Sequence, residues 1–186
     1  MFATAGWDVT VVSDQANVPV PGGVTATDCW ADADLHALMV ANRNPATDLD
    51  GDWHIHRLVV PAHITCGRGA MYDTIGVPRE GVASFSDDGY PSSQSAFFGT
   101  AADQMQRNVP PAFLRSACHE LGHGFNQIHQ EQEAGADNSI MTTTPSVADV
   151  LVARPGCSPT TSTWPSTSTS ATTWCTSPTS RCGPAA

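Results

Sequence analysis

The sequence predicts an α+β domain, and three observations favour this class. Apolar residues recur with helical spacing before residue 42 and again after residue 110. Short β-rich runs bounded by turn residues stand between these two segments. The order, with strands and a helix first and helices with little strand afterwards, is typical of an α+β domain. We find no internal repeat that would indicate a solenoid.

The composition divides the chain of 186 residues into two parts, and the length suits one domain with a sizeable core. Residues 1–155 have a mixed composition with apolar periodicity, so we expect them to fold. Residues 156–186 consist largely of Ser, Thr and Pro, and their one charge is Arg181. Such a segment buries too little apolar area to offset its ordering entropy, so we expect it to be disordered.

Three segments have the pattern of β-strands. Residues 7–12 (WDVTVV) alternate in polarity, residues 53–60 (WHIHRLVV) are rich in β-branched residues, and residues 82–86 (VASFS) are flanked by turn residues.

An amphipathic helix is expected to end near Asn42, because Pro45 follows. Thr27 or Asp28 is the candidate N-cap. The helix would direct an apolar stripe into the core, formed by Trp30, Leu35, Leu38 and Met39.

Two further helices are expected in the second half of the domain. Pro110 and Pro111 suit a first helical turn with Asn108 as its cap, and Ser146 can cap a last helix over 147–153. The former helix would direct four residues into the core, namely Phe113, Leu114, Ala117 and Leu121.

The charge balance bears on the partners. The formal net charge is −10, from 18 acidic and 8 basic residues, and every base is Arg. An acidic chain without a basic cluster argues against nucleic acid and anionic membrane as partners. No apolar run is long enough to span a membrane.

The cysteines bear on the compartment in which the protein works. Their even number in an acidic chain without Lys favours disulfides and an oxidising compartment, although free buried thiols are an equal alternative. No signal peptide is recognisable in residues 1–10, so a cytoplasmic location stays the alternative. The six cysteines are Cys29, Cys66, Cys118, Cys157, Cys175 and Cys182.

One motif carries chemistry: His119-Glu120-Leu121-Gly122-His123, which has the form H-E-x-x-H. Residues four apart lie on one face of a helix, so both imidazoles can reach one Zn²⁺. Glu120 sits where its carboxylate can meet a metal-bound water. His129 follows six residues after His123, and it can join the same metal only if the chain turns between them. In a shuffled chain of this composition the whole pattern has an expectation of roughly 2 in 10,000.

The segment HELGHGFNQIH resembles the elongated zinc signature H-E-x-x-H-x-x-G-x-x-H of the metzincin metalloproteases. One position departs from it, because the family Gly falls on Asn126. That Gly turns the chain with a positive φ toward the third ligand. Asn is the next most tolerant residue for this conformation, so we expect the turn to persist. The specific likeness covers residues 119–141.

The resemblance implies further features. Ser139-Ile140-Met141 is similar to the methionine turn beneath the zinc site of metzincins, with Met141 as its methionine. Where some metzincins have a Tyr two residues later, this chain has Thr143. The fold implied is a small mixed sheet with an edge strand above a cleft, a helix that carries the motif, the methionine turn and a C-terminal helix. The implied edge strand, which would bind extended substrate by strand addition, is Gly81-Val82-Ala83-Ser84.

The resemblance also implies the activity, that of a zinc endopeptidase. One catalytic Zn²⁺ would be held by His119, His123 and His129, and Glu120 would be general base and then general acid. We expect a monomer that acts on protein or peptide substrates.

Two competing functions stay open. A deformylase-type zinc hydrolase also uses H-E-x-x-H, but it takes a distant Cys as third ligand, and His129 disfavours it. A non-catalytic secreted binding module would leave Glu120 and the three His unexplained.

Other candidate metal sites are weaker. Asp48, Asp50 and Asp52 are calcium-like in composition, but Trp53 stands where an EF-hand requires Gly, so we expect a solvated turn and no supported Ca²⁺. The remaining candidates are more often structural, and they are the pairs His54 with His56 and His63 with Cys66. Cys118 is expected in the core.

Overall fold

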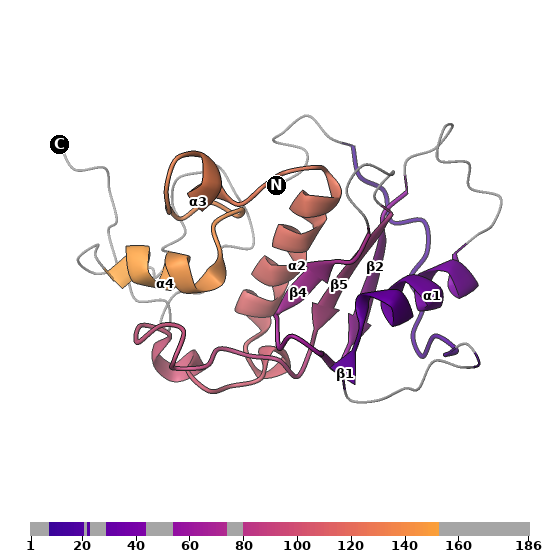
Figure 1. The fold of residues 1–186 in the computed structure, drawn as a ribbon, viewed down its shortest axis with the longest axis horizontal. Coiled ribbons are helices and arrows are strands. Elements are labelled where there is room, and N and C mark those ends of the chain that lie inside the picture. The colour runs from indigo at the N-terminus through magenta and orange to yellow at the C-terminus, as the bar shows by residue number, and fades with distance from the viewer. Residues whose placement is uncertain (1–7, 21, 23–28, 44–53, 74–79, 153–186) are drawn as a thin grey trace.

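A three-stranded mixed sheet forms the centre of the protein (Figure 1). The computed structural model describes residues 8–20, 22, 29–43, 54–73 and 80–152. Strand β5 (Gly81–Phe85) lies between β2 (His56–Val60), to which it is parallel, and β4 (Gly69–Met71), to which it is antiparallel. A separate parallel pair joins β1 (Cys29–Trp30) to β3 (Ala62–His63). The predicted α+β class and the mixed sheet are confirmed.

Helix α1 (Asp32–Asn42) covers one face of the sheet. The register pairs Leu58 with Ala83 and Val60 with Phe85, which places these side chains on the same face because side chains alternate along a strand. They pack with the four residues of the predicted apolar stripe, of which Trp30 lies in β1 and the others in α1; all are at most 4% exposed: Trp30, Leu35, Leu38 and Met39.

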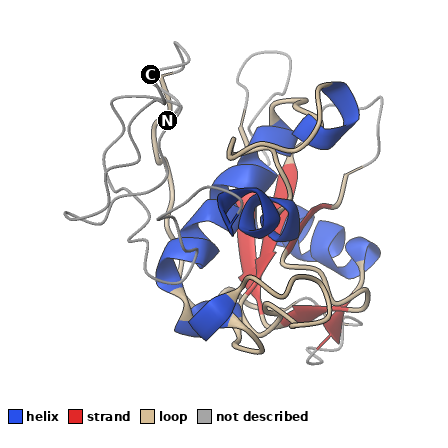
Figure 2. Cartoon of the chain, turned by 90° about the vertical axis from the view of Figure 1, so that its left-hand side faces the viewer, coloured by secondary structure: helices blue, strands red, loops and turns tan. Residues whose placement is uncertain are grey.

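Helix α2 (Pro110–Gly124) covers the opposite face (Figure 2). A methyl group at Gly124 would touch the Val82 side chain, and Val82 alternates with the residues of β5 that face α1. The sheet is therefore enclosed between two helices, which explains why all five residues of β5 are buried.

The chain between β5 and α2, and the chain after α2, form the other half of the molecule. Two short 3₁₀ turns, η2 (Gly99–Ala101) and η3 (Gln106–Asn108), precede α2, and α3 (Gln130–Glu133) and α4 (Thr144–Val152) follow it. A second apolar cluster packs the segment after β5 against α2 and α4. It is formed by Tyr90, Phe98, Ala112 and Ala148. No helix in the described ranges is long and apolar enough to cross a membrane.

Two predictions near the N-terminus are wrong. Residues 8–12 are exposed and pair with no described strand, and an extended segment that neither pairs nor buries one face is not stable as a strand. Helix α1 begins at Asp32 with Ala31 as its N-cap, because Cys29–Trp30 is occupied in pairing with β3. Trp7, Thr27 and Asp28 lie outside the described residues.

The helix starts and three core assignments also differ from the predictions, since Phe113 and Leu121 of α2 are half-buried and only Ala117 is fully buried. Asn108 belongs to η3, so Val109 is the N-cap of α2, although Pro110 and Pro111 do occupy its first turn. Leu114 is 60% exposed, because α2 turns a different side toward each of its two neighbours and leaves Leu114 outside both. Helix α4 begins at Thr144 rather than at 147. The tail predicted to be disordered lies outside the described residues.

Candidate metal centre

The two histidines of the motif lie on one face of α2, as the spacing predicts. Their Nε2 atoms are 3.2 Å apart. His119 is buried and His123 is half-buried, so the pair is covered on one side and open on the other. A site of this shape can hold an ion and still admit a substrate.

The end of α2 brings the third histidine to the other two. Asn126 has φ +62°, the left-handed conformation expected from its place in the motif. The amides of Asn126 and Gln127 donate to the carbonyls of His123 and Gly122 at 2.9 and 3.0 Å, which is the hydrogen-bond pattern of a Schellman cap. The chain thus leaves the helix axis at once, and His129 returns toward the helix. The prediction for Asn126 is confirmed.

The three imidazoles form a nearly equilateral triangle of nitrogen atoms. The Nε2 atom of His129 lies 3.1 Å from that of His119 and 3.1 Å from that of His123. Three ligands of a tetrahedral zinc at Zn–N of 2.0–2.1 Å are about 3.3–3.4 Å apart. In the described residues no other group of three His, Cys, Asp or Glu side chains converges in this way.

The hydrogen bonds of the outer ring nitrogens show that this triangle suits a cation. His119 Nδ1 lies 2.7 Å from the carbonyl of Ile140, and His123 Nδ1 lies 2.7 Å from that of Gln127. A carbonyl only accepts, so each Nδ1 carries the proton and each Nε2 presents a lone pair. Burial also lowers the pKa of His119 to about 3, which keeps it neutral. Lone pairs directed at one another at 3.2 Å repel unless a cation lies between them, so the donor set fits a metal ion.

Glu120, the residue after His119 on α2, packs against strand β4. It is 8% exposed, and burial raises its pKa to about 8, with partial opposition from the charge of Arg68. A methyl group at Gly69 would lie 2.4 Å from Glu120 Cγ. The backbone of β4 therefore lies directly on the Glu120 side chain, and only Gly leaves room for it.

The turn Ser139–Met141, which we call the Met141 turn, lies beneath the histidines. A methyl group at Gly122 would be 2.3 Å from Met141 Sδ, so the methionine fills the space left by that glycine. The Gln130 amide donates to the Met141 carbonyl at 3.1 Å, which ties the residue after His129 to the same turn. Met141 thus packs against α2, and its carbonyl is tied to the residue that follows His129.

The predicted substrate strand is wrong in its position within the sheet. Gly81, Val82, Ala83 and Ser84 belong to β5, whose two sides are paired with β2 and β4. A central strand has no free backbone groups to offer a peptide. Among the described strands, β4 is the edge on the Glu120 side, and its outer side is unpaired.

The weaker candidate sites do not assemble. His63 is held by Asp32 and Thr65 at 3.1 and 2.7 Å and stacks on Phe85, so its role is structural. His54, His56 and Cys66 join no group of three ligands within the described ranges. No disulfide joins any two of Cys29, Cys66 and Cys118, and Cys118 is half-buried rather than in the core. Asp48, Asp50 and Asp52 lie outside the described residues.

Sequence reasoning missed Arg115, which is buried and binds the Met141 turn. The available signal was its spacing, because it precedes His119 by four residues and must share its face of the helix. A charged residue in a helix is ordinarily expected to face solvent.

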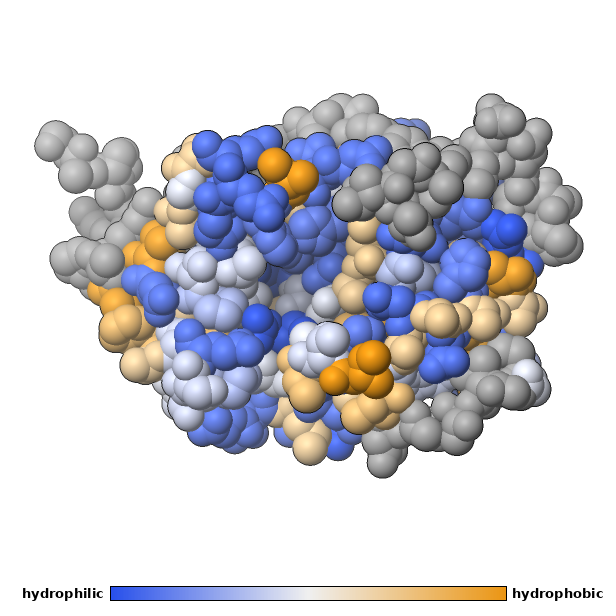
Figure 3. Space-filling model, viewed as in Figure 1, coloured by the Kyte–Doolittle hydropathy of each residue, from blue (hydrophilic) through white to orange (hydrophobic). Residues whose placement is uncertain are grey.

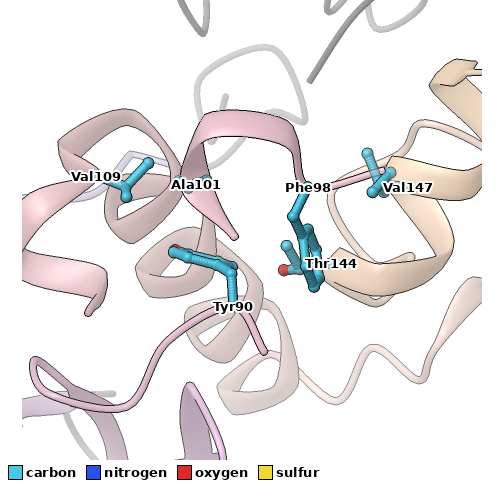
Figure 4. A pocket seen from close by; sticks show the side chains of 8 residues that line it. Tyr90, Phe98, Ala101, Val109, Thr144 and Val147 are labelled. Carbon is cyan, nitrogen blue, oxygen red and sulfur yellow. The ribbon is translucent and has the colours of Figure 1, made fainter. Parts of the chain in front are cut away.

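Figure 3 shows that this face of the molecule is hollowed near its centre, with hydrophilic residues above the hollow and some apolar residues below it. A separate apolar cavity lies between the start of α2, α4 and the 90–101 segment (Figure 4). Ala112 in its wall is seven residues before His119, or about 10 Å along the helix, so this cavity is not part of the metal centre. Its lining is Tyr90, Phe98, Ala101, Val109, Ala112, Thr144, Val147 and Ala148.

Neither a protein-family model, nor a curated protein, nor a solved structure matches the chain. What the structure supports is a mixed α+β fold that brings together three histidines able to bind a metal ion.

Proposed function

We propose that this chain is a zinc-dependent endopeptidase of the metzincin type. The observation that carries the proposal is the triangle of Nε2 atoms from His119, His123 and His129, with sides of 3.1–3.2 Å, next to the buried carboxyl of Glu120 on the same helix. Three neutral histidines with an open fourth position are typical of catalytic rather than structural zinc sites.

The three histidines would hold the zinc, and Glu120 would move the proton. When bound, zinc lowers the pKa of water toward about 7 and polarises a carbonyl. Glu120 accepts the proton of the attacking water and delivers it to the leaving amine. Its burial holds the pKa of the carboxyl above the usual range, and a base whose pKa lies near neutrality can both take and return a proton.

The edge of β4 supports a peptide as the substrate. An extended chain can pair with its unpaired outer side, and main-chain hydrogen bonds of this kind recognise a peptide of any sequence. Gly69 in this strand lies against Glu120, so a peptide bound along β4 passes close to the carboxyl. Extended binding supports cleavage within a chain rather than at its ends.

The test is zinc content and casein hydrolysis of the full chain and of Glu120→Gln. We expect about one zinc per chain in both proteins, and a loss of turnover of about 10²–10⁴-fold in the variant, because a general acid–base contributes that much. Chelation should inactivate the wild type, and added Zn²⁺ should restore it. Mass spectrometry of the products should show internal cleavage.

Three results would contradict the proposal. Undiminished proteolysis by Glu120→Gln would remove the proton-transfer role. Zinc binding without proteolysis would favour the amidohydrolase alternative, and a wild type that binds no zinc would favour a binding module.

A further inference from the structure

Arg115 is a buried cation directly behind the metal centre. It is 3% exposed and precedes His119 by one helical turn. Its Nη2 donates to the carbonyl of Ser139 at 2.9 Å, to that of Ile140 at 3.4 Å and also to that of Thr142. Its Nη1 donates to the hydroxyl of Thr144, at the start of α4, at 3.1 Å. One guanidinium therefore spans the Met141 turn and the helix after it.

One of these carbonyls also accepts a hydrogen bond from a proposed zinc ligand. The Ile140 oxygen accepts from Arg115 and, at 2.7 Å, from His119 Nδ1. Arg115 and His119 lie on the same face of α2, so the carbonyl is held from two consecutive turns of one helix. The direction of this carbonyl decides which nitrogen of His119 carries the proton and which way its ring faces.

The chemistry of this contact requires arginine. Burial lowers the pKa of Arg115 to about 10, so it stays protonated at neutral pH. Its planar fork presents several donors in fixed directions, which suits carbonyls spread along a turn. Lysine has its charge at one point and cannot reach the same set of acceptors together.

We propose that Arg115 is a positioning residue for the metal centre: it fixes the Ile140 carbonyl, and that carbonyl fixes His119 as a ligand. The inference rests on the proposed function, because it takes His119 to bind zinc. Outer partners of metal-binding histidines typically contribute 10–100-fold to metal affinity, and Arg115 acts one step beyond such a partner.

The test compares Arg115→Lys with Arg57→Lys in the full chain. Arg57 is the control, because it is an arginine beside α2 whose side chain is exposed and lies over Phe113 at 5.7 Å and near Ser84 Oγ at 3.4 Å, away from the Met141 turn. Zinc affinity is measured by competition with a chromophoric chelator, and the ligand geometry by the visible spectrum of the Co²⁺-loaded protein. Urea unfolding in chelator gives the stability of each metal-free variant.

We expect Arg115→Lys to bind zinc about 10-fold more weakly and to change the Co²⁺ spectrum. Arg57→Lys should keep the wild-type zinc affinity and Co²⁺ spectrum, even if its metal-free stability falls as much as that of Arg115→Lys. If Arg115→Lys does not fold, Arg115→Gln replaces it, because an amide keeps two donors without burying a charge; the same loss of affinity is expected.

Two outcomes would overturn the inference while leaving the proposed function intact. One is zinc affinity and a Co²⁺ spectrum in the Arg115 variants equal to those of the wild type. The other is an equal loss of affinity in Arg57→Lys, which would show that general destabilisation is the cause. A wild type without zinc affinity would instead contradict the proposed function and the inference together.

Discussion

The two sides of helix α2 differ in what they hold. The side toward the sheet carries Glu120, which packs against Gly69 of β4. The side toward the Met141 turn carries Arg115, His119 and Gly122, which contact that turn. One helix thus packs the group that would move a proton against β4, and a group that would hold the metal against the Met141 turn. Changes on the sheet side should affect turnover, and changes on the turn side should affect metal binding.

Among changes outside the proposed catalytic and metal-binding residues, the largest effect is expected from Gly69→Ala, on the sheet side. The new methyl group would stand 2.4 Å from Glu120 Cγ, so the carboxyl must move from its position against β4. We expect casein hydrolysis to fall at least about 10-fold, since small displacements of a catalytic group are costly, with zinc affinity unchanged. Equal loss of both properties would show that the two sides are not separate.

Gly122→Ala is the matching change on the turn side. Its methyl group would meet Met141 Sδ at 2.3 Å and displace the methionine, at a cost of about 1–3 kcal/mol in unfolding free energy. Because the Met141 turn also carries the carbonyl that binds His119, we expect weaker zinc binding, measured by chelator competition. A gain in stability would contradict this packing, since Ala is otherwise the better helix former by about 1 kcal/mol.

In the metal-free protein, a rise in pH should change the stability contributed by the two sides of α2 in opposite directions. The pKa of Glu120 is raised to about 8 by burial, so its contribution to stability is lost as pH rises from the unfolded value of 4.5 toward 8. The pKa of His119 is lowered to about 3 by burial, so its contribution is lost as pH falls below 6.5. Of these two groups, only Glu120 changes its protonation between pH 6.5 and 8 in the folded protein.

We therefore expect the unfolding free energy, measured in urea with chelator, to fall by about 1–2 kcal/mol from pH 6.5 to 8. The fall should be absent in Glu120→Gln. The same slope in that variant would show that another group is responsible.

The smallest effect concerns the turn that joins the two motif histidines to the third. Asn126→Ala places a residue with a Cβ and no local polar group at φ +62°, which costs about 1 kcal/mol, whereas Asn126→Gly should be tolerated. Zinc affinity and thermal unfolding of the two variants measure this difference. Identical values for both would mean that the left-handed conformation is not required.

The metal centre was predictable because its determinants are local. His119 and His123 follow from helix periodicity, and Asn126 follows from the conformational tolerance of its residue type. The sheet was less predictable, because strand order depends on pairing between distant segments. The sequence pattern of β5 is that of any buried strand, and the short β4, which contains two small residues, gives little signal. Arg115 was missed because burial of a charge is a tertiary property.

The proposed zinc site depends most directly on His129 joining His119 and His123 as a third ligand. The decisive measurement is zinc stoichiometry and affinity of the wild type and of His129→Ala. We predict about one tightly bound zinc per chain in the wild type, and a large loss of affinity in the variant while the metal-free fold is retained. Wild-type affinity in His129→Ala, or no zinc in either protein, would contradict the account.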